Sequence, residues 1–197
     1  MYAEGGDSVR FRHYTGSNRV WNSWVDIGGE FKGDPVLVPV NETYFTFFGI
    51  HVDGDIVTFN WTNATGVGYR PALASLGGNF TSMPSAIVSN TNPLRLDVVA
   101  LGMGGNYEHK TFRDGRWSAG WEDLGVSGSS APLLYQYETK ADAGRGESQN
   151  MTVMAAIGED NQLRYASWET STTLAWRDLL GTWTNAGGNL TTKSMCD

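Results

Sequence analysis

Short apolar stretches alternate with turn-forming residues along the whole chain. A first set of stretches begins at a proline, as in "PVLVPV", "PSAIVS" and "PLLYQY", and a second set follows, as in "YFTFFGI", "LRLDVVALG" and "MTVMAAIG". The second set leads into turn-forming dipeptides, which are Asp53-Gly54, Gly104-Gly105 and Asp160-Asn161. Such dipeptides are typical of hairpins between antiparallel strands. No stretch sustains a helical period, so the pattern predicts short strands.

The strand pattern repeats along the sequence. Four apolar residues mark equivalent points, and they lie 49, 48 and 55 residues apart: Ile27, Leu76, Leu124 and Leu179. A polar insert at 137–150 accounts for the longer last interval. Each full repeat holds four predicted strands, and the last strand of the final repeat is expected at "LAWRDL", residues 174–179. Four-stranded units of this length are typical of β-propeller blades.

We therefore expect an all-β fold, a single partial β-propeller over residues 1–197 with four-stranded antiparallel blades and repeats of about 49 residues. The expected units are a half blade at 8–34 and full blades at 35–83, 84–131 and 132–181. The tail "GTWTNAGGNLTTKSMCD" lacks the apolar stretches that would complete the first blade. We expect a piece of a longer propeller or, as the alternative, half of a ring formed by self-association.

Large aromatic residues recur at fixed places in the repeat. One column holds Trp24, Trp121 and Trp176, and a second holds Tyr14, Trp61, Phe112 and Trp168. Columns of this kind fill the wedge between neighbouring blades in many propellers. The alternative is that some of these rings form a platform for a ligand.

One stretch resembles a known repeat. The sequence "LRLDVVALGMGGNYEHKTFRDGRWSAGWEDLGVSGSSAP" is similar to the repeat of the seven-bladed, fucose-binding propeller lectins of bacteria and fungi. The matching residues are Asp97-Val98, His109, Phe112, Asp114-Gly115, Trp117, Trp121, Leu124-Gly125 and Pro132. The histidine column reads Phe11, Thr58, His109 and Tyr165, so one unit alone keeps the histidine of that family. The resemblance implies carbohydrate binding in clefts between blades.

Sugar binding asks for aromatic rings beside polar groups, because a pyranose has one apolar face and a rim of hydroxyls. The third predicted strand of each unit interleaves these residue types. The candidate carbohydrate-binding residues are Thr58, Asn60, Trp61, His109, Trp117, Trp121, Tyr165, Trp168 and Trp176. The alternative for His109 is a packed, hydrogen-bonded strand residue. Fucosylated or O-methylated glycans are the expected partners.

Charge and motifs narrow the function further. The net charge of −7, without a cluster of lysines and arginines, argues against nucleic acid and anionic membranes as partners. No apolar run has the length of a membrane span, and no cofactor or metal is expected. The stretch "FRDGRW" is interpreted as a hairpin turn at Asp114-Gly115 rather than a sialidase motif. A lectin is the main hypothesis; a protein-interaction platform is the alternative, and a glycan-processing enzyme comes third.

Glycosylation sequons point to a compartment. Asn-x-Thr begins at six positions, Asn41, Asn60, Asn63, Asn79, Asn150 and Asn189, which is typical of a secreted glycoprotein but can also arise by chance in a threonine-rich protein. Asn63 and Asn79 fall in predicted loops and are the expected occupied sites. The first residues lack the apolar segment of a signal peptide, so export would need a signal further upstream. The single Cys196 cannot form an internal disulfide.

Overall fold

The fold consists almost entirely of β-strands. The computed structural model describes residues 8–12, 14–15, 20–41, 44–62, 72–89, 94–139, 149–171, 176–180 and 183–188. The chain divides into two compact units, Met1–Pro84 (unit 1) and Ser85–Asp197 (unit 2), and each unit is described by itself. Within the described ranges, no helix combines the length and the apolar character needed to cross a membrane.

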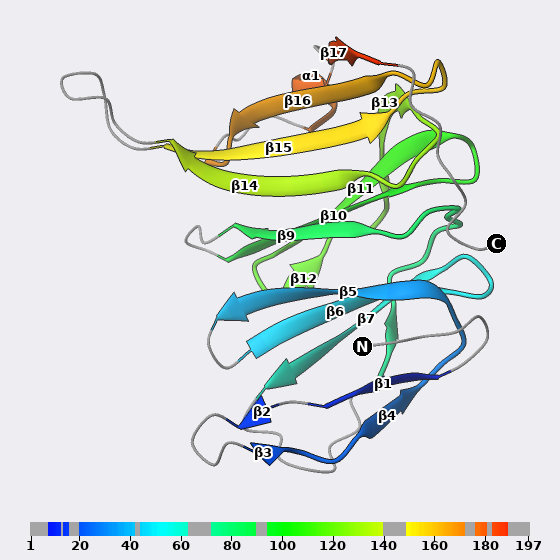
Figure 1. Ribbon diagram of the computed structural model, residues 1–197, viewed down its shortest axis with the longest axis vertical. Coiled ribbons are helices and arrows are strands. Elements are labelled where there is room, and N and C mark those ends of the chain that lie inside the picture. Colours follow the sequence, from blue (N-terminus) through cyan, green and yellow to red (C-terminus); the bar gives the residue numbers. More distant parts are fainter. Residues whose placement is uncertain are drawn as a thin grey trace. The chain divides into compact units, whose positions relative to one another are not determined.

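Unit 1 contains a four-stranded antiparallel sheet and two shorter strand pairs (Figure 1). The sheet has the order β5-β6-β7-β8, with β5 at Phe31–Asn41, β6 at Tyr44–His51, β7 at Ile56–Thr62 and β8 at Ala74–Ser75. The shorter pairs are β1 (Val9–Phe11) with β4 (Val25–Gly28), and β2 (Tyr14–Thr15) with β3 (Val20–Trp21). We call β1 to β4 the partial blade.

Aromatic side chains fill the core of unit 1. Phe47 and Phe59 stack with their ring centroids 4.7 Å apart, and they bring β6 and β7 together on one face of the sheet. The ring centroid of Phe11, in the partial blade, lies 6.2 Å from that of Phe59 and 6.3 Å from that of Trp61. The partial blade therefore packs against β7, and burial of these rings is the main force that joins the two parts.

Unit 2 contains two sheets. The first has the order β12-β11-β10-β9, with β13 also paired to β11; the strands are β9 (Ser85–Ser89), β10 (Arg95–Leu101), β11 (Asn106–Arg113), β12 (Arg116–Trp117) and β13 (Glu122–Ser127). The second has the order β14-β15-β16-β17, with β14 at Leu133–Thr139, β15 at Gln149–Ile157, β16 at Leu163–Glu169 and β17 at Thr184–Gly187.

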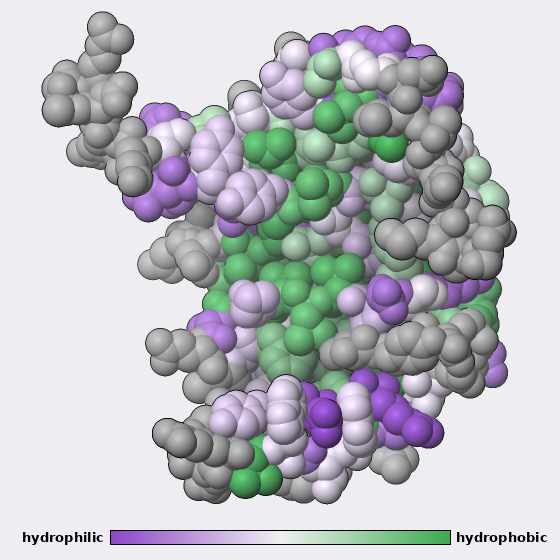
Figure 2. All heavy atoms as spheres, in the orientation of Figure 1, coloured by the Kyte–Doolittle hydropathy of each residue, from purple (hydrophilic) through white to green (hydrophobic). Residues whose placement is uncertain are grey.

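The two sheets of unit 2 meet through β9 and β14. The backbone N–H of Leu134 donates to Ser85 Oγ at 2.9 Å, and Gln136 Nε2 donates to Ser89 Oγ at 3.0 Å. One apolar cluster continues from the first sheet into the second, so the two sheets share a core. At the far end of the second sheet β17 is mostly exposed, and Figure 2 shows hydrophilic residues gathered there.

The predicted all-β fold of four-stranded antiparallel blades is confirmed. The predicted hairpin turns are also present, because Gly54, Gly105 and Asn161 all have positive φ. In the turn of "FRDGRW", Asp114 and Gly115 have φ values of 53° and 78°, and Arg113 pairs with Arg116 across it. Two successive residues with positive φ are what a tight two-residue hairpin requires.

The prediction of a strand at "LAWRDL" is wrong. Residues Trp176–Leu180 form the helix α1, and the fourth strand of this sheet is β17, which lies in the tail and pairs with β16. Trp176 and Leu180 are buried and are spaced four residues apart, whereas Asp178 between them is exposed. An i, i+4 pair of apolar residues lies on one face of a helix, which explains how this short segment buries both side chains.

One hydrogen bond recurs at the fourth strand of every blade, at or just after the end of β4, β8 and β17 and within β13. In each case a glycine N–H donates to the side chain two residues earlier: Gly28 to Asp26 at 2.8 Å, Gly77 to Ser75 at 3.0 Å, Gly125 to Asp123 at 2.7 Å and Gly187 to Asn185 at 2.7 Å. All four glycines have positive φ, between 69° and 78°. At this point the backbone leaves the extended strand conformation and forms a turn with positive φ, which glycine adopts readily.

The recurring turn also corrects the repeat alignment. The residue between acceptor and glycine is Ile27, Leu76, Leu124 or Ala186, so Ala186 and not Leu179 is the fourth marker. Trp183, three residues before Ala186, then takes the place of Trp24 and Trp121 that the alignment had given to Trp176. The sequence itself carries this match, since "WTNAGG" at 183–188 repeats "WVDIGG" at 24–29.

We expect two neighbouring glycines to differ in what they tolerate. A Cβ on Gly77 would meet no atom within 4 Å, whereas a Cβ on Gly78 would lie 2.0 Å from Cε2 of the buried Phe80 ring. Gly77→Ala should therefore lower the free energy of unfolding by about 1–2 kcal/mol through backbone strain alone. Gly78→Ala should lower it further. Urea titrations of the two variants and the wild type test this, and equal losses would contradict it.

Candidate functional site

The strand register aligns the third strand of every blade. In each case one residue faces the fourth strand at the same place relative to the recurring turn: Phe11 opposite Val25, Thr58 opposite Ala74, His109 opposite Glu122 and Tyr165 opposite Thr184. These four residues are the predicted histidine column. Their surroundings in the structure differ from blade to blade.

On β7, two of the three sugar-binding candidates are packed inside unit 1. Thr58 is buried and its hydroxyl donates to the carbonyl of Phe47 at 2.7 Å. Trp61 is buried and stacks on Phe45 with the ring centroids 5.0 Å apart. Asn60 is exposed, and its Oδ1 accepts a hydrogen bond from the hydroxyl of Thr46 at 3.0 Å. Thr58 and Trp61 thus hold the sheet together rather than present a surface.

His109 is enclosed in a network of charged groups in unit 2. Only 4% of the residue is exposed. Its Nε2 lies 2.9 Å from Asp97 Oδ1, and its Nδ1 lies 3.3 Å from Glu122 Oε2. Asp97, also buried, accepts a further hydrogen bond on Oδ1 from Arg95 Nε at 3.0 Å, and its Oδ2 lies 2.8 Å from the same Nε as an ion pair. A neutral imidazole has one N–H, so the doubly protonated ring is the form that can donate to both carboxylates at once.

Trp176 covers the face of His109. The two rings are stacked, with centroids 4.2 Å apart and planes inclined by 12°, and Trp168 meets Trp176 edge-on at 4.9 Å. Both tryptophans are buried. The structure therefore brings His109, Trp168 and Trp176 together, but as a packed cluster between β11, β16 and α1. A sugar would reach this cluster only if α1 were displaced.

The remaining candidates in unit 2 are more accessible but lie apart. Trp117 lines a shallow hollow of about 190 Å³ together with Arg113 and Arg116. Neither Trp121 nor Tyr165 lines that hollow. The ring of Trp121 lies 5.5 Å from Lys110 Nζ, a buried cation.

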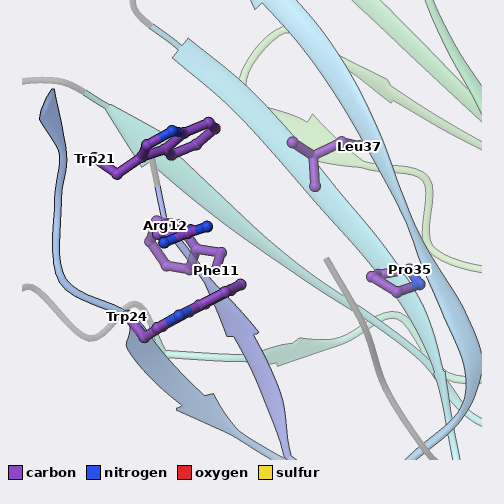
Figure 3. A pocket seen from close by; sticks show the side chains of 6 residues that line it. All are labelled: Phe11, Arg12, Trp21, Trp24, Pro35 and Leu37. Carbon is purple, nitrogen blue, oxygen red and sulfur yellow. The ribbon is translucent and has the colours of Figure 1, made fainter. Parts of the chain in front are cut away.

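An open pocket occurs in unit 1, and none of the nine candidate carbohydrate-binding residues is among its described lining residues. The pocket has a volume of about 440 Å³ and opens between the partial blade and β5 (Figure 3). The partial blade supplies four of its lining residues and β5 supplies two: Phe11, Arg12, Trp21, Trp24, Pro35 and Leu37. This volume lies within the usual range for small-molecule sites.

Arg12 is sandwiched between two exposed tryptophans in this pocket. Its guanidinium carbon lies 4.8 Å from the ring centroid of Trp21 and 4.8 Å from that of Trp24. These distances are within the range of cation–π attraction. Figure 3 shows the guanidinium between the two indoles, with Leu37 and Pro35 across the opening. Trp21 is 55% exposed and Trp24 is 54% exposed, which is unusual for so large an apolar ring.

Local strand pairing sets the positions of both indoles. Trp21 pairs with Tyr14 in the β2–β3 hairpin, as Trp117 pairs with Phe112 in the β11–β12 hairpin, and the ring centroids are 5.4 Å apart in both pairs. Trp24 comes two residues before the Asp26 of the recurring turn. Hydrogen bonds from Gly28 and Ser8 and the nearby Arg10 lower the pKa of Asp26, so this carboxylate is already engaged outside the pocket.

Unit 2 has a buried counterpart of this arrangement. By the strand register Lys110 occupies the place of Arg12, and Trp121 occupies the place of Trp24. Leu37 of β5 pairs with Phe47 of β6, and Leu134 of β14 pairs with Met154 of β15 at the equivalent place. Leu134 is 6% exposed, whereas Leu37 is 43% exposed. A cation beside a tryptophan in both units is a pattern that the sequence carries, and it could have drawn attention to Arg12. The exposure that distinguishes the two places could not be foreseen from that pattern.

The glycosylation candidates fall in different places. Asn79 is exposed in the connection after β8, and Asn63 lies outside the described residues. In the described part of the chain, no cluster of three or more histidine, cysteine, aspartate or glutamate side chains is arranged to hold a metal ion.

We expect His109→Ala to destabilise unit 2. Removal of the imidazole leaves the buried Asp97 with one hydrogen-bond partner fewer and takes away the ring that Trp176 stacks on. Loss of one partner from a buried charged network costs about 3 kcal/mol. Tyr165→Ala, at the equivalent place but 38% exposed, is the matched control and should cost less than about 1 kcal/mol. Thermal melts of both variants test this; a His109→Ala protein as stable as the wild type would contradict it.

Comparison with known proteins supplies a fold relationship. No protein-family model matches the sequence, and no curated protein sequence is significantly similar to it. Solved structures with a similar fold include two lectins. The first is a fucose lectin from Kordia zhangzhouensis in complex with methyl-fucoside, at a TM-score of 0.53 and 14% identity; the match covers 77% of this chain and 96% of that lectin.

The second structure is a triple arginine-to-alanine mutant of AofleA, a fucose-specific lectin from the fungus Arthrobotrys oligospora. The TM-score is 0.57 at 14% identity, and the match covers 83% of this chain and 47% of AofleA, so this chain spans about half the length of that lectin. Both proteins are β-propeller lectins. The blades described above therefore have the fold of the β-propeller lectins.

Proposed function

We propose that this protein is a carbohydrate-binding lectin module that holds a monosaccharide unit of a glycan in the pocket around Arg12, without catalysis. The observation that carries the proposal is the pair of exposed indoles on either side of a cation, in an open pocket of about 440 Å³. The fold is shared with lectins, which adds support of a general kind.

The chemistry of the pocket suits a pyranose. More than half of Trp21 and of Trp24 is exposed, so the indole surface that Arg12 leaves uncovered is available to the C–H side of a sugar ring, and Leu37 adds an apolar wall across the opening. Arg12 and the two indole N–H groups can donate hydrogen bonds to ring substituents. Because the indoles hold the guanidinium between them, little rotational freedom remains for binding to remove.

Fucose is the first ligand to test, because the lectin from Kordia zhangzhouensis was solved with methyl-fucoside. Fucosylated and O-methylated glycans should therefore be included in a glycan array of the purified protein. We further propose that the protein is a secreted glycoprotein, on the strength of its six Asn-x-Thr sequons.

Trp24→Ala and Trp21→Ala should each weaken saccharide binding about tenfold or more, because each removes one stacking face of the pocket. Both side chains are more than half exposed, so neither change opens a cavity in the core. Titration calorimetry with the best ligand of the glycan array measures the effect. The control is Tyr135→Ala, which removes an exposed aromatic ring of β14 that does not line the pocket. Unaltered binding by both tryptophan variants would remove the pocket from the proposal.

Asn79 should carry an N-glycan when the protein is secreted from a eukaryotic host, because its exposed side chain leaves room for one in the folded state. Asn60 should remain unmodified, since it lies within β7 and its side chain is bonded to Thr46. Mass spectrometry of peptides from the wild type, with Asn79→Gln as the control, decides the matter. A secreted protein with no glycan at Asn79 would contradict this prediction.

A further inference from the structure

Building on the proposed function, we infer that the pocket around Arg12 prefers acidic saccharides, in which a ring carboxylate binds the guanidinium. The inference concerns the class of ligand and rests on three properties of the lining residues. These are the donor and acceptor groups of the side chains, the charge of the pocket, and the way in which the indoles constrain Arg12.

Among the described lining residues of the pocket, the polar side-chain groups are all donors. Arg12 offers five N–H groups, and Trp21 and Trp24 offer one indole N–H each; none of the three has an acceptor. Phe11, Pro35 and Leu37 have no polar side-chain group at all. The hydroxyls of a neutral sugar are donors as well as acceptors, so such a ligand brings donor hydrogens that these side chains cannot accept. An ionised carboxylate is an acceptor only, and it matches the lining.

The charge of the pocket points in the same direction. Arg12 is the one charged residue among the described lining residues, and no ion pair of Arg12 is present in the described part of the chain. Other arginines differ in this respect, since Arg10, Arg95 and Arg164 each pair with an aspartate. Asp26, the one carboxylate among the described residues of the partial blade, is hydrogen-bonded to Ser8, Arg10 and Gly28. A carboxylate of the ligand would therefore be the partner that the guanidinium lacks.

The indoles determine how that partner can approach. With Trp21 and Trp24 over its two faces, as Figure 3 shows, the guanidinium keeps the N–H groups at its edge for a ligand. A guanidinium edge binds a carboxylate through two parallel hydrogen bonds. Charge-assisted bonds of this kind are about twice as strong as bonds between neutral groups. The net charge of the protein is −7, so a preference for an anion would have to come from this local geometry.

The test compares sugars that differ only at C6. Methyl galactoside and its galacturonate counterpart form one pair, methyl glucoside and its glucuronate counterpart form a second, and methyl-fucoside is a further neutral probe. In titration calorimetry we expect the carboxylate member of at least one pair to bind tenfold or more tightly than its neutral partner. Raising the salt concentration should reduce that preference, because salt screens the ion pair.

Two arginine variants separate a local from a general charge effect. Arg12→Gln should abolish the preference, whereas Arg10→Gln, the same charge change two residues away on β1, should preserve it because Arg10 does not line the pocket. Equal binding of neutral and acidic members, with loss of both in Trp24→Ala, would overturn the inference and leave the proposed function standing. A preference that survives Arg12→Gln would also overturn it. If no pyranoside of either kind binds, the proposed function itself fails.

Discussion

The hydrogen bond from a glycine N–H to the side chain two residues earlier gives the fourth strand of every blade the same turn, within the strand in β13 and at or just after its end in the other blades. Four different residues serve as the acceptor, Asp26, Ser75, Asp123 and Asn185, and the glycine is present each time. The bond places the third and fourth strands in one register, so that Arg10, Val57, Glu108 and Arg164 face these acceptors. Everything that lies on the third strand, including Arg12 and His109, is positioned by that register.

The common register gives each blade equivalent backbone positions, but the side chains at these positions differ from blade to blade. Arg10 and Asp26 have opposite charges, whereas Glu108 faces the like-charged Asp123, and burial together with Asp123 raises the pKa of Glu108. One residue further along the third strand, His109 is enclosed by carboxylates and by Trp176, whereas Tyr165 at the equivalent place is partly exposed. The position after that is occupied by Arg12 in unit 1, which lies between two exposed tryptophans, and by the buried Lys110 in unit 2. Equivalent backbone positions therefore produce an open pocket in unit 1 and a packed cluster in unit 2.

The parts of the fold that depend on local sequence were predictable. Alternating apolar stretches and dipeptides such as Asp114-Gly115 were sufficient to predict the strands and hairpins, because both signals act over a few residues. The helix α1 was missed because its five residues are too few to show a helical period, and the helix is held by burial of Trp176 and Leu180. The burial of His109 was left open by the sequence because it depends on this same contact with α1. Arg12 was missed because the sequence has a cation at the equivalent place in both units, Arg12 and Lys110, and does not show which of the two is exposed.

The shared register separates the number of open pockets from the number of blades. Arg12, Trp24 and Leu37 have defined counterparts in Lys110, Trp121 and Leu134, so the backbone that carries a pocket in unit 1 is present again in unit 2. Two of the three counterparts are the same residue type, yet Leu37 is 43% exposed and Leu134 is 6% exposed. For protein engineering, the partial blade is thus a template for an open pocket, and the equivalent place in unit 2 is where a second pocket would be built without adding a repeat.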